Sequence, residues 1–126
     1  MLVSSIPQYI QGLTNAKLVL TTTDATVLYT APSGAESNSS VINSIIVHEH
    51  SNNSDTVRVF ITDIDGNVFE MFDKTVAGHG TEELLTRDLA LKEGESLYIE
   101  AGTANRLHVV ASIQEFAIHR TPQVDL

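Results

Sequence analysis

The sequence predicts an all-β protein built as an antiparallel β-sandwich of about eight strands. Short segments alternate apolar and polar residues with a period of two, which is typical of strands that bury one face. Turn signals rich in Gly, Asn, Asp and Ser separate these segments at fairly regular spacing. Eight strands pair naturally into two four-stranded sheets, so we expect a jelly-roll-like arrangement. A chain of 126 residues without cysteine fits one such domain, stabilised by packing.

The stretch 91–116 contains the clearest strand signals in the chain. Strands are predicted at 96–101 and 107–115, and the polar segment 102–105 joins them as a hairpin. We expect positive φ angles at both ends of that segment and at Gly94 in the preceding turn. The two strands should bury their shared apolar face, whose main residues are Leu97, Ile99, Leu107, Val109 and Ile113.

Six further strands are expected before this stretch. They are predicted at 17–20, 26–30, 41–50, 56–62, 67–73 and 81–87. The strand 41–50 is apolar on both faces and should be central; its two faces carry Val41, Ile45 and Val47 on one side and Ile42 and Ile46 on the other. Asp65-Gly66 predicts a tight hairpin turn between the strands 56–62 and 67–73.

Residues 1–15 form an apolar segment without a charged residue, which we interpret as an N-terminal arm. Part of this segment follows the spacing of a helix face, namely Ile6, Tyr9, Ile10 and Leu13. One or two helical turns and an extended arm are both compatible with this pattern. Because so short an apolar segment must be buried somewhere, we expect it to dock on its own sandwich or on a neighbouring subunit.

The domain plan is therefore the arm, a sandwich domain over 16–120 and a C-terminal tail over 121–126. The formal net charge is −9, and the seven Lys and Arg residues are scattered along the chain. Nucleic acid and anionic membranes are poor partners for such a chain, since both bind through clustered basic residues. A basic protein surface remains a suitable partner.

His48 and His50 are the candidate metal ligands, because residues two apart on a strand share a face. They resemble the His-x-His pair of cupins, and Asp55 lies near the position of the acidic residue that follows it there. The flanking glycines and the second motif with its third histidine are missing, so we favour a pair of surface histidines. A cupin-like metal-binding enzyme remains an alternative.

The segment Asp63-Ile64-Asp65-Gly66-Asn67 is interpreted as the hairpin turn and not as a calcium loop. An EF-hand loop ends in a bidentate Glu at its twelfth position, and here that position is Lys74. The chain also lacks a nucleophile elbow and a phosphate-binding glycine loop. We therefore predict no catalytic residue and no cofactor.

Four segments of the chain carry a resemblance to a known family. They are Tyr29-Thr30-Ala31-Pro32, 41–47, 91–95 and 107–115. Over residues 28–116 the chain resembles small bacteriophage virion proteins, with Glu95 where that family carries Asp. The resemblance implies a β-sandwich that decorates a capsid as a cement protein, or that forms part of a tail, baseplate or fibre. It implies no catalytic residues, a place in the virion after assembly in the host cytoplasm, and the major capsid protein or another virion protein as partner.

We also expect a homo-oligomer, either a dimer or a trimer. Outward-facing apolar residues on two strands should combine into one exposed patch, and such patches often mark interfaces. The alternative is that the second sheet or the arm covers them. With the arm included, the interface candidates are Leu2, Ile6, Tyr9, Ile10, Leu13, Phe60, Val110, Phe116 and Ile118.

Overall fold

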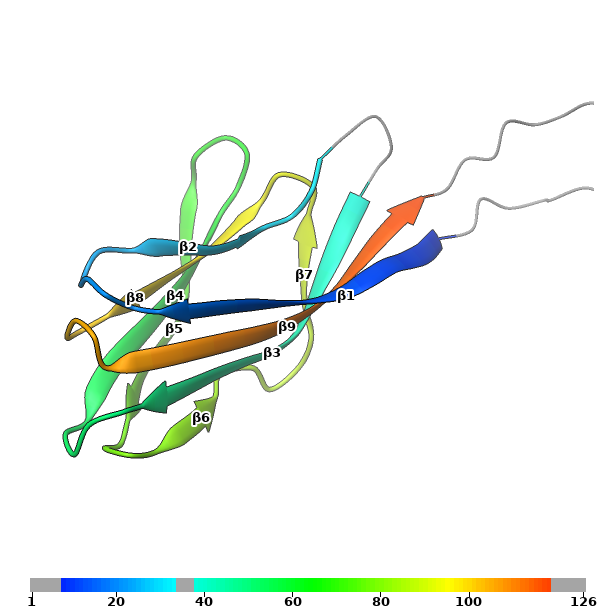
Figure 1. Cartoon of the computed structure of the whole chain (residues 1–126). Helices are drawn as coiled ribbons and strands as arrows, with labels where there is room; N and C mark the ends of the chain where they lie inside the picture. The colour runs from blue at the N-terminus through cyan, green and yellow to red at the C-terminus, as the bar shows by residue number, and fades with distance from the viewer. Residues whose placement is uncertain (1–7, 34–37, 119–126) are drawn as a thin grey trace, which may run out of the picture.

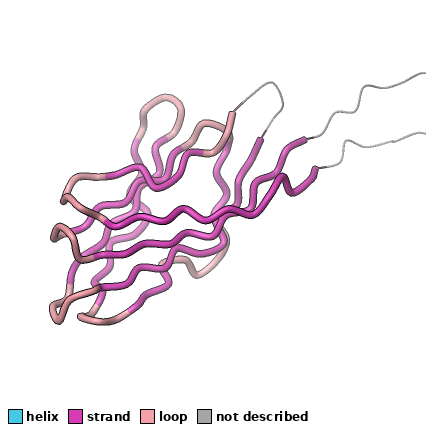
Figure 2. The backbone as a smooth tube through the Cα atoms, in the orientation of Figure 1, coloured by secondary structure: helices cyan, strands magenta, loops and turns pink. Residues whose placement is uncertain are grey.

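The protein is a sandwich of two antiparallel β-sheets in a computed structural model that describes residues 8–33 and 38–118 (Figure 1). The strands are β1 (Gln8–Val19), β2 (Thr26–Thr30), β3 (Asn38–Glu49), β4 (Asp55–Thr62), β5 (Val68–Val76), β6 (Thr81–Glu83), β7 (Leu89–Lys92), β8 (Ser96–Ala101) and β9 (Leu107–Ile118). Figure 2 shows strands and loops, and no helix, in the described part of the chain. The all-β prediction is confirmed.

Sheet A has the strand order β1-β9-β3-β6, and sheet B has the order β2-β8-β4-β5. β9 pairs with β3 along its whole length, so β6 and β7 must share the other side of β3. Counting that shared edge as one position gives two sheets of four. With β6 and β7 counted as one strand, successive strands of the chain lie in different sheets, except for β4 and β5, which are neighbours in sheet B. This alternation between the sheets is the predicted jelly-roll arrangement.

Alternate apolar residues of both sheets fill the space between them, as expected for packed sheets. The five residues predicted as the main core are each 0–1% exposed; they are Leu97, Ile99, Leu107, Val109 and Ile113. This burial confirms the face assigned to β8 and β9, and it is the main source of stability in a protein without disulfide bonds.

The predicted hairpin at 91–116 is wrong in its pairing, although both of its strands are present. β8 pairs with β2 and β4 in sheet B, whereas β9 pairs with β1 and β3 in sheet A. The connecting loop is held between the sheets, because Gly102 N donates to Thr56 O (2.9 Å) and Asn105 N donates to Leu20 O (2.7 Å). Asn105 has the expected positive φ of 65°, as does Gly94 with 79°, but Gly102 does not.

The helical interpretation of the N-terminal arm is wrong for residues 8–15, which belong to β1. β1 runs through the expected domain boundary and pairs with β9 of the same chain, from Gln8 with Ile118 to Val19 with His108. The described part of the arm is therefore extended and docks on its own sandwich. Leu13 is 75% exposed, so the apolar spacing did not mark a buried helix face. Leu2 and Ile6 lie outside the described residues.

β3 is central in sheet A, as predicted, but its two faces differ from the prediction. Ile42 and Ile45 are both fully buried although they are three residues apart. The pairing of β3 with β9 shifts register between Ile42 and Ser44, and such an irregularity reverses the alternation of the side chains. Ile46 consequently points away from the core and is 41% exposed.

The turn between β4 and β5 is the predicted hairpin turn, with Gly66 at a φ of 86°. The carboxylate of Asp63 organises it by accepting hydrogen bonds from Asp65 N (3.0 Å) and Asn67 N (2.9 Å). Asn67 Nδ2 donates to the second carboxylate oxygen (3.2 Å). These bonds, led by the one from the Asn67 backbone, hold the pKa of Asp63 below its ordinary value.

Replacing Asp63 with Asn should therefore make stability less dependent on pH. A carboxylate with a lowered folded-state pKa stabilises the fold above its unfolded pKa of about 3.9, and this contribution is lost as the pH falls through the folded value. We expect Asp63→Asn to unfold at a lower urea concentration than the wild type at pH 7. The difference between the two unfolding midpoints should become smaller below about pH 4. A difference of equal size at pH 7 and pH 3 would contradict this role.

Candidate functional site

His48 and His50 lie at the end of β3, on either side of the fully buried Glu49. Because Glu49 faces the core, His48 points to the outer side of sheet A, where its Nδ1 is 2.8 Å from Thr81 Oγ1. His50 is exposed, and its ring centroid is 5.2 Å from that of His108. In the described residues no three His, Asp or Glu side chains are arranged to hold a metal ion.

The described interface candidates do not form one patch. Phe60 is half-buried on the outer face of sheet B, whereas Val110 is 37% exposed on the outer face of sheet A. Residues on opposite outer faces of a sandwich cannot join, so the predicted single patch is wrong. Phe116 is half-buried in β9, and the backbones of Tyr9, Ile10 and Ile118 take part in the β1–β9 pairing.

The edge strand β5 exposes a further set of large apolar side chains. Val68 is 62% exposed, Phe69 52% and Met71 41%, and within the described residues β5 has a strand on one side only. The sequence does carry a signal for this surface, since Val68, Phe69, Met71 and Phe72 are too closely spaced to share one buried face. The predicted strand 67–73 corresponds to β5, but its place at the edge of sheet B follows only from the strand order.

Sheet A also has an exposed edge strand, β1. β1 has a paired strand on the β9 side only, among the residues described, and exposes Leu13 (75%) and Val19 (43%). Its one charged residue is Lys17. Soluble proteins usually protect such edges with charges or proline, because an unpaired strand invites another strand to pair with it.

The outer face of sheet B holds a shallow pocket of about 350 Å³. Phe60 of β4 and Tyr98 of β8 are direct cross-strand partners in its floor. The remaining lining residues are Ala25, Thr62, Val68 and Glu100. An apolar floor with few polar groups is the usual composition of a binding pocket.

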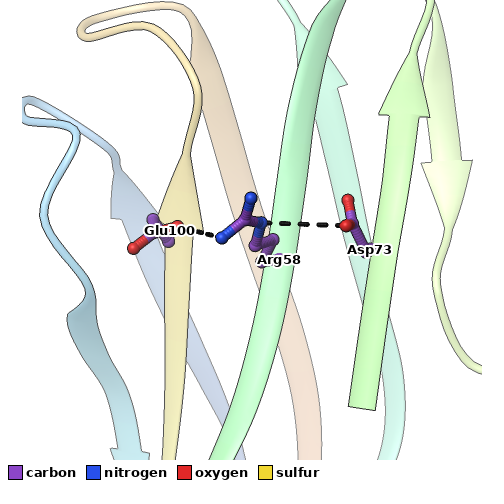
Figure 3. Close-up of polar contacts among 3 residues, drawn as sticks. All are labelled: Arg58, Asp73 and Glu100. Atoms are coloured by element: carbon purple, nitrogen blue, oxygen red, sulfur yellow. Dashed lines mark ion pairs between the residues drawn. The ribbon is translucent and has the colours of Figure 1, made fainter. Parts of the chain in front are cut away.

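An ion triad lies on this face next to the pocket (Figure 3). Arg58 on β4 stands between two acidic residues of the neighbouring strands: its Nη1 is 3.5 Å from Glu100 Oε1, and its Nε is 3.8 Å from Asp73 Oδ2. The side chains of Arg58 and Asp73 are about half exposed, so solvent screens these pairs and they contribute little to stability. Their importance is the charge that they place at the rim of the pocket.

A polar cluster links the two sheets where sheet A extends past sheet B. The Tyr29 hydroxyl donates to Glu115 Oε2 (2.5 Å), and it is 2.7 Å from the hydroxyl of the fully buried Ser40. Burial, and then the bond to Glu115, raise the pKa of the Tyr29 hydroxyl. Tyr29 belongs to a segment that carried the family resemblance, and its place here is structural: it connects β2 to β3 and β9.

The strand order defines the class of the protein as a jelly-roll β-sandwich. No family model matches the chain, and no curated protein matches it in sequence. The described residues contain no helix that is long and apolar enough to cross a membrane.

Solved structures resemble the chain at low identity. A chain of Bacillus endospore appendages, described as a novel family of disulfide-linked pili, has a TM-score of 0.49 and 9% identity, covering 94% of this chain and 100% of that one. A chain of infectious bursal disease virus, Gt strain, has a TM-score of 0.30 and 12% identity, and the match covers 90% of this chain and 32% of the viral one. For the Gx strain the TM-score is 0.33 and the identity 10%, and the match covers 92% of this chain and 42% of the viral one. The chain thus spans less than half of either viral chain. At TM-scores below 0.5 these similarities support no statement about function.

Proposed function

We propose that this protein is a structural component of a bacteriophage virion, most specifically a capsid decoration or cement protein that acts as a homo-oligomer. Its role is adhesive and not enzymatic, and its place is the virion, assembled in the host cytoplasm. Two features support the proposal: the resemblance of residues 28–116 to small virion proteins, and a jelly-roll fold that is used in viral capsids among other proteins. Fold alone does not determine function.

The observation that carries the proposal is the apolar surface at the edge of sheet B. A strand that exposes Val68, Phe69 and Met71 beside unpaired backbone groups is a surface suited to a second chain. Apolar side chains of this size contribute about 1.5–3 kcal/mol each when they become fully buried. Copies that meet at this edge would bury these side chains from both partners and add main-chain hydrogen bonds.

The adhesive mechanism follows from linkage. A protein that binds the assembled shell better than the free capsid subunits stabilises the shell by mass action. An oligomer increases this effect, because several copies linked together bind neighbouring shell subunits at high effective concentration. The major capsid protein is the proposed partner.

Self-association can be tested by light scattering at micromolar concentration. We expect an oligomer for the wild type and a monomer for the double variant Val68→Lys/Met71→Lys, because two charges at the edge oppose burial there. The matched control is Val110→Lys, which places a charge at an exposed valine on the outer face of sheet A. A monomeric wild type would overturn the self-association, and an equal effect of Val110→Lys would overturn the choice of edge.

The position in the particle can be tested by counting copies in purified virions by quantitative mass spectrometry. A cement protein is present in hundreds of copies. A handful of copies would instead favour a tail, baseplate or fibre component with the same fold. Absence from the virion would overturn the proposal.

A further inference from the structure

The pocket on the outer face of sheet B shares Val68 with the edge proposed for self-association, but its aromatic and acidic residues are not part of that edge. Its floor is aromatic, formed by the cross-strand pair Phe60 and Tyr98. Val68 pairs with Thr62 and closes the side toward the edge strand β5. A flat side chain with an apolar stem can therefore lie on the rings and against Val68.

The rim of this pocket is acidic. Glu100 lines the pocket with a side chain that is 29% exposed, and it must share its neighbour Arg58 with Asp73. Glu70 also faces outward, directly opposite Phe60. The outer face around the pocket thus carries three carboxylates and one guanidinium, within a chain of net charge −9. An added cation would be attracted to this face.

We propose that the pocket binds an arginine side chain of a basic partner protein. A guanidinium is planar, stacks on aromatic rings, and pairs with carboxylates, while its carbon stem packs on apolar surface. The pocket offers all three kinds of surface: the aromatic rings of Tyr98 and Phe60, the carboxylate of Glu100 and the apolar side chain of Val68. A neutral sugar would use the rings but would gain nothing from the negative charge of the rim.

The proposal can be tested by NMR with Nα-acetyl-arginine amide as the probe and Nα-acetyl-citrulline amide as its uncharged analogue. We expect saturable shifts of the backbone signals of Phe60, Tyr98 and Glu100 with the arginine probe. The citrulline analogue should bind at least about fivefold more weakly, because it has the same shape without the cation. Equal affinity for the two probes, or arginine shifts that centre elsewhere or are absent, would overturn the proposal.

Two variants and a matched control test the assigned residues. Glu100→Gln removes the carboxylate, and Tyr98→Leu removes a ring while keeping an apolar side chain, so each should weaken binding of the arginine probe several-fold. Glu82→Gln removes an exposed carboxylate of β6 in sheet A, away from the pocket, and this variant should bind the probe as the wild type does. If the control variant loses as much affinity for the arginine probe as Glu100→Gln does, the effect is general charge attraction, and the assignment of Glu100 is overturned.

A third probe separates the other occupant. Methyl glucoside should leave the signals of Phe60 and Tyr98 in place, and binding of this sugar in preference to arginine would overturn the proposal in favour of a carbohydrate site. These binding measurements use the full chain, and the expected affinities for the probes do not require the protein to be an oligomer. Their failure is therefore distinguishable from a failure of the proposed self-association.

Discussion

Leu97→Ala is expected to lower the free energy of unfolding by about 2–5 kcal/mol, with a fall in melting temperature on the order of 10 °C. Leu97 is 0% exposed in β8, a strand with neighbours on both sides in sheet B. Removing most of its side chain leaves a cavity that the packed sheets can close only in part. Urea unfolding followed by circular dichroism measures this effect.

The matched control is Leu13→Ala, because Leu13 has the same side chain but is 75% exposed on β1. Its effect on the isolated domain should stay within about 0.5 kcal/mol. If both variants lose the same stability, the loss cannot come from burial in the core, and the assigned face of β8 would be contradicted.

Gly78→Ala should cost about 1–3 kcal/mol, since it introduces a methyl group where there is no space. A Cβ at Gly78 would overlap with the carbonyl group of Asn52 and lie 2.9 Å from Asn53 N. These are backbone atoms that cannot rotate away. The loop after β5 is also bonded to the loop after β3, through His79 N and Ser51 O at 2.8 Å, so both loops would have to move.

The control for this variant is Gly12→Ala in β1, where an added Cβ meets nothing within 4 Å. The expected change is close to zero or slightly stabilising, because alanine has fewer conformations to lose on folding. Thermal unfolding of both variants compares the two sites directly. Equal destabilisation would show that loss of glycine freedom, and not the contact with Asn52, is responsible.

The strands were predictable because alternation is a local property of the sequence. β2 and β8 have the predicted bounds, while the strand expected at 81–87 is in fact the short β6 followed by buried Leu84 and Leu85. β7 was not predicted, since its four residues border the turn at Gly94. Alternation decides which side chains face inward, and it does so equally well for a hairpin and for two strands in different sheets.

Partner strands could not be predicted, because pairing depends on contacts between residues far apart in the chain. The connection 102–106 is long enough for a hairpin or for a crossing between sheets, and only its bonds to Thr56 and Leu20 decide the matter. The same limit applies to the site. Phe60 was singled out from its strand, but its neighbour Tyr98 follows from the β4–β8 pairing, and the exposure of β5 follows from its place at an edge.

The place of β9 between β1 and β3 also fixes when sheet A can form during synthesis. β1 has no partner other than β9 among the described strands, and nearly 90 residues separate the end of β1 from the start of β9. At roughly 5–20 residues per second, the ribosome needs about 4–18 s to make that stretch. β1 therefore waits without a partner strand until β9 emerges, and β3 waits without its partner on that side, whereas the β4–β5 hairpin can close at once. A nascent chain stalled before Leu107 should bind chaperones that recognise exposed apolar strands, and release from them should coincide with the emergence of β9.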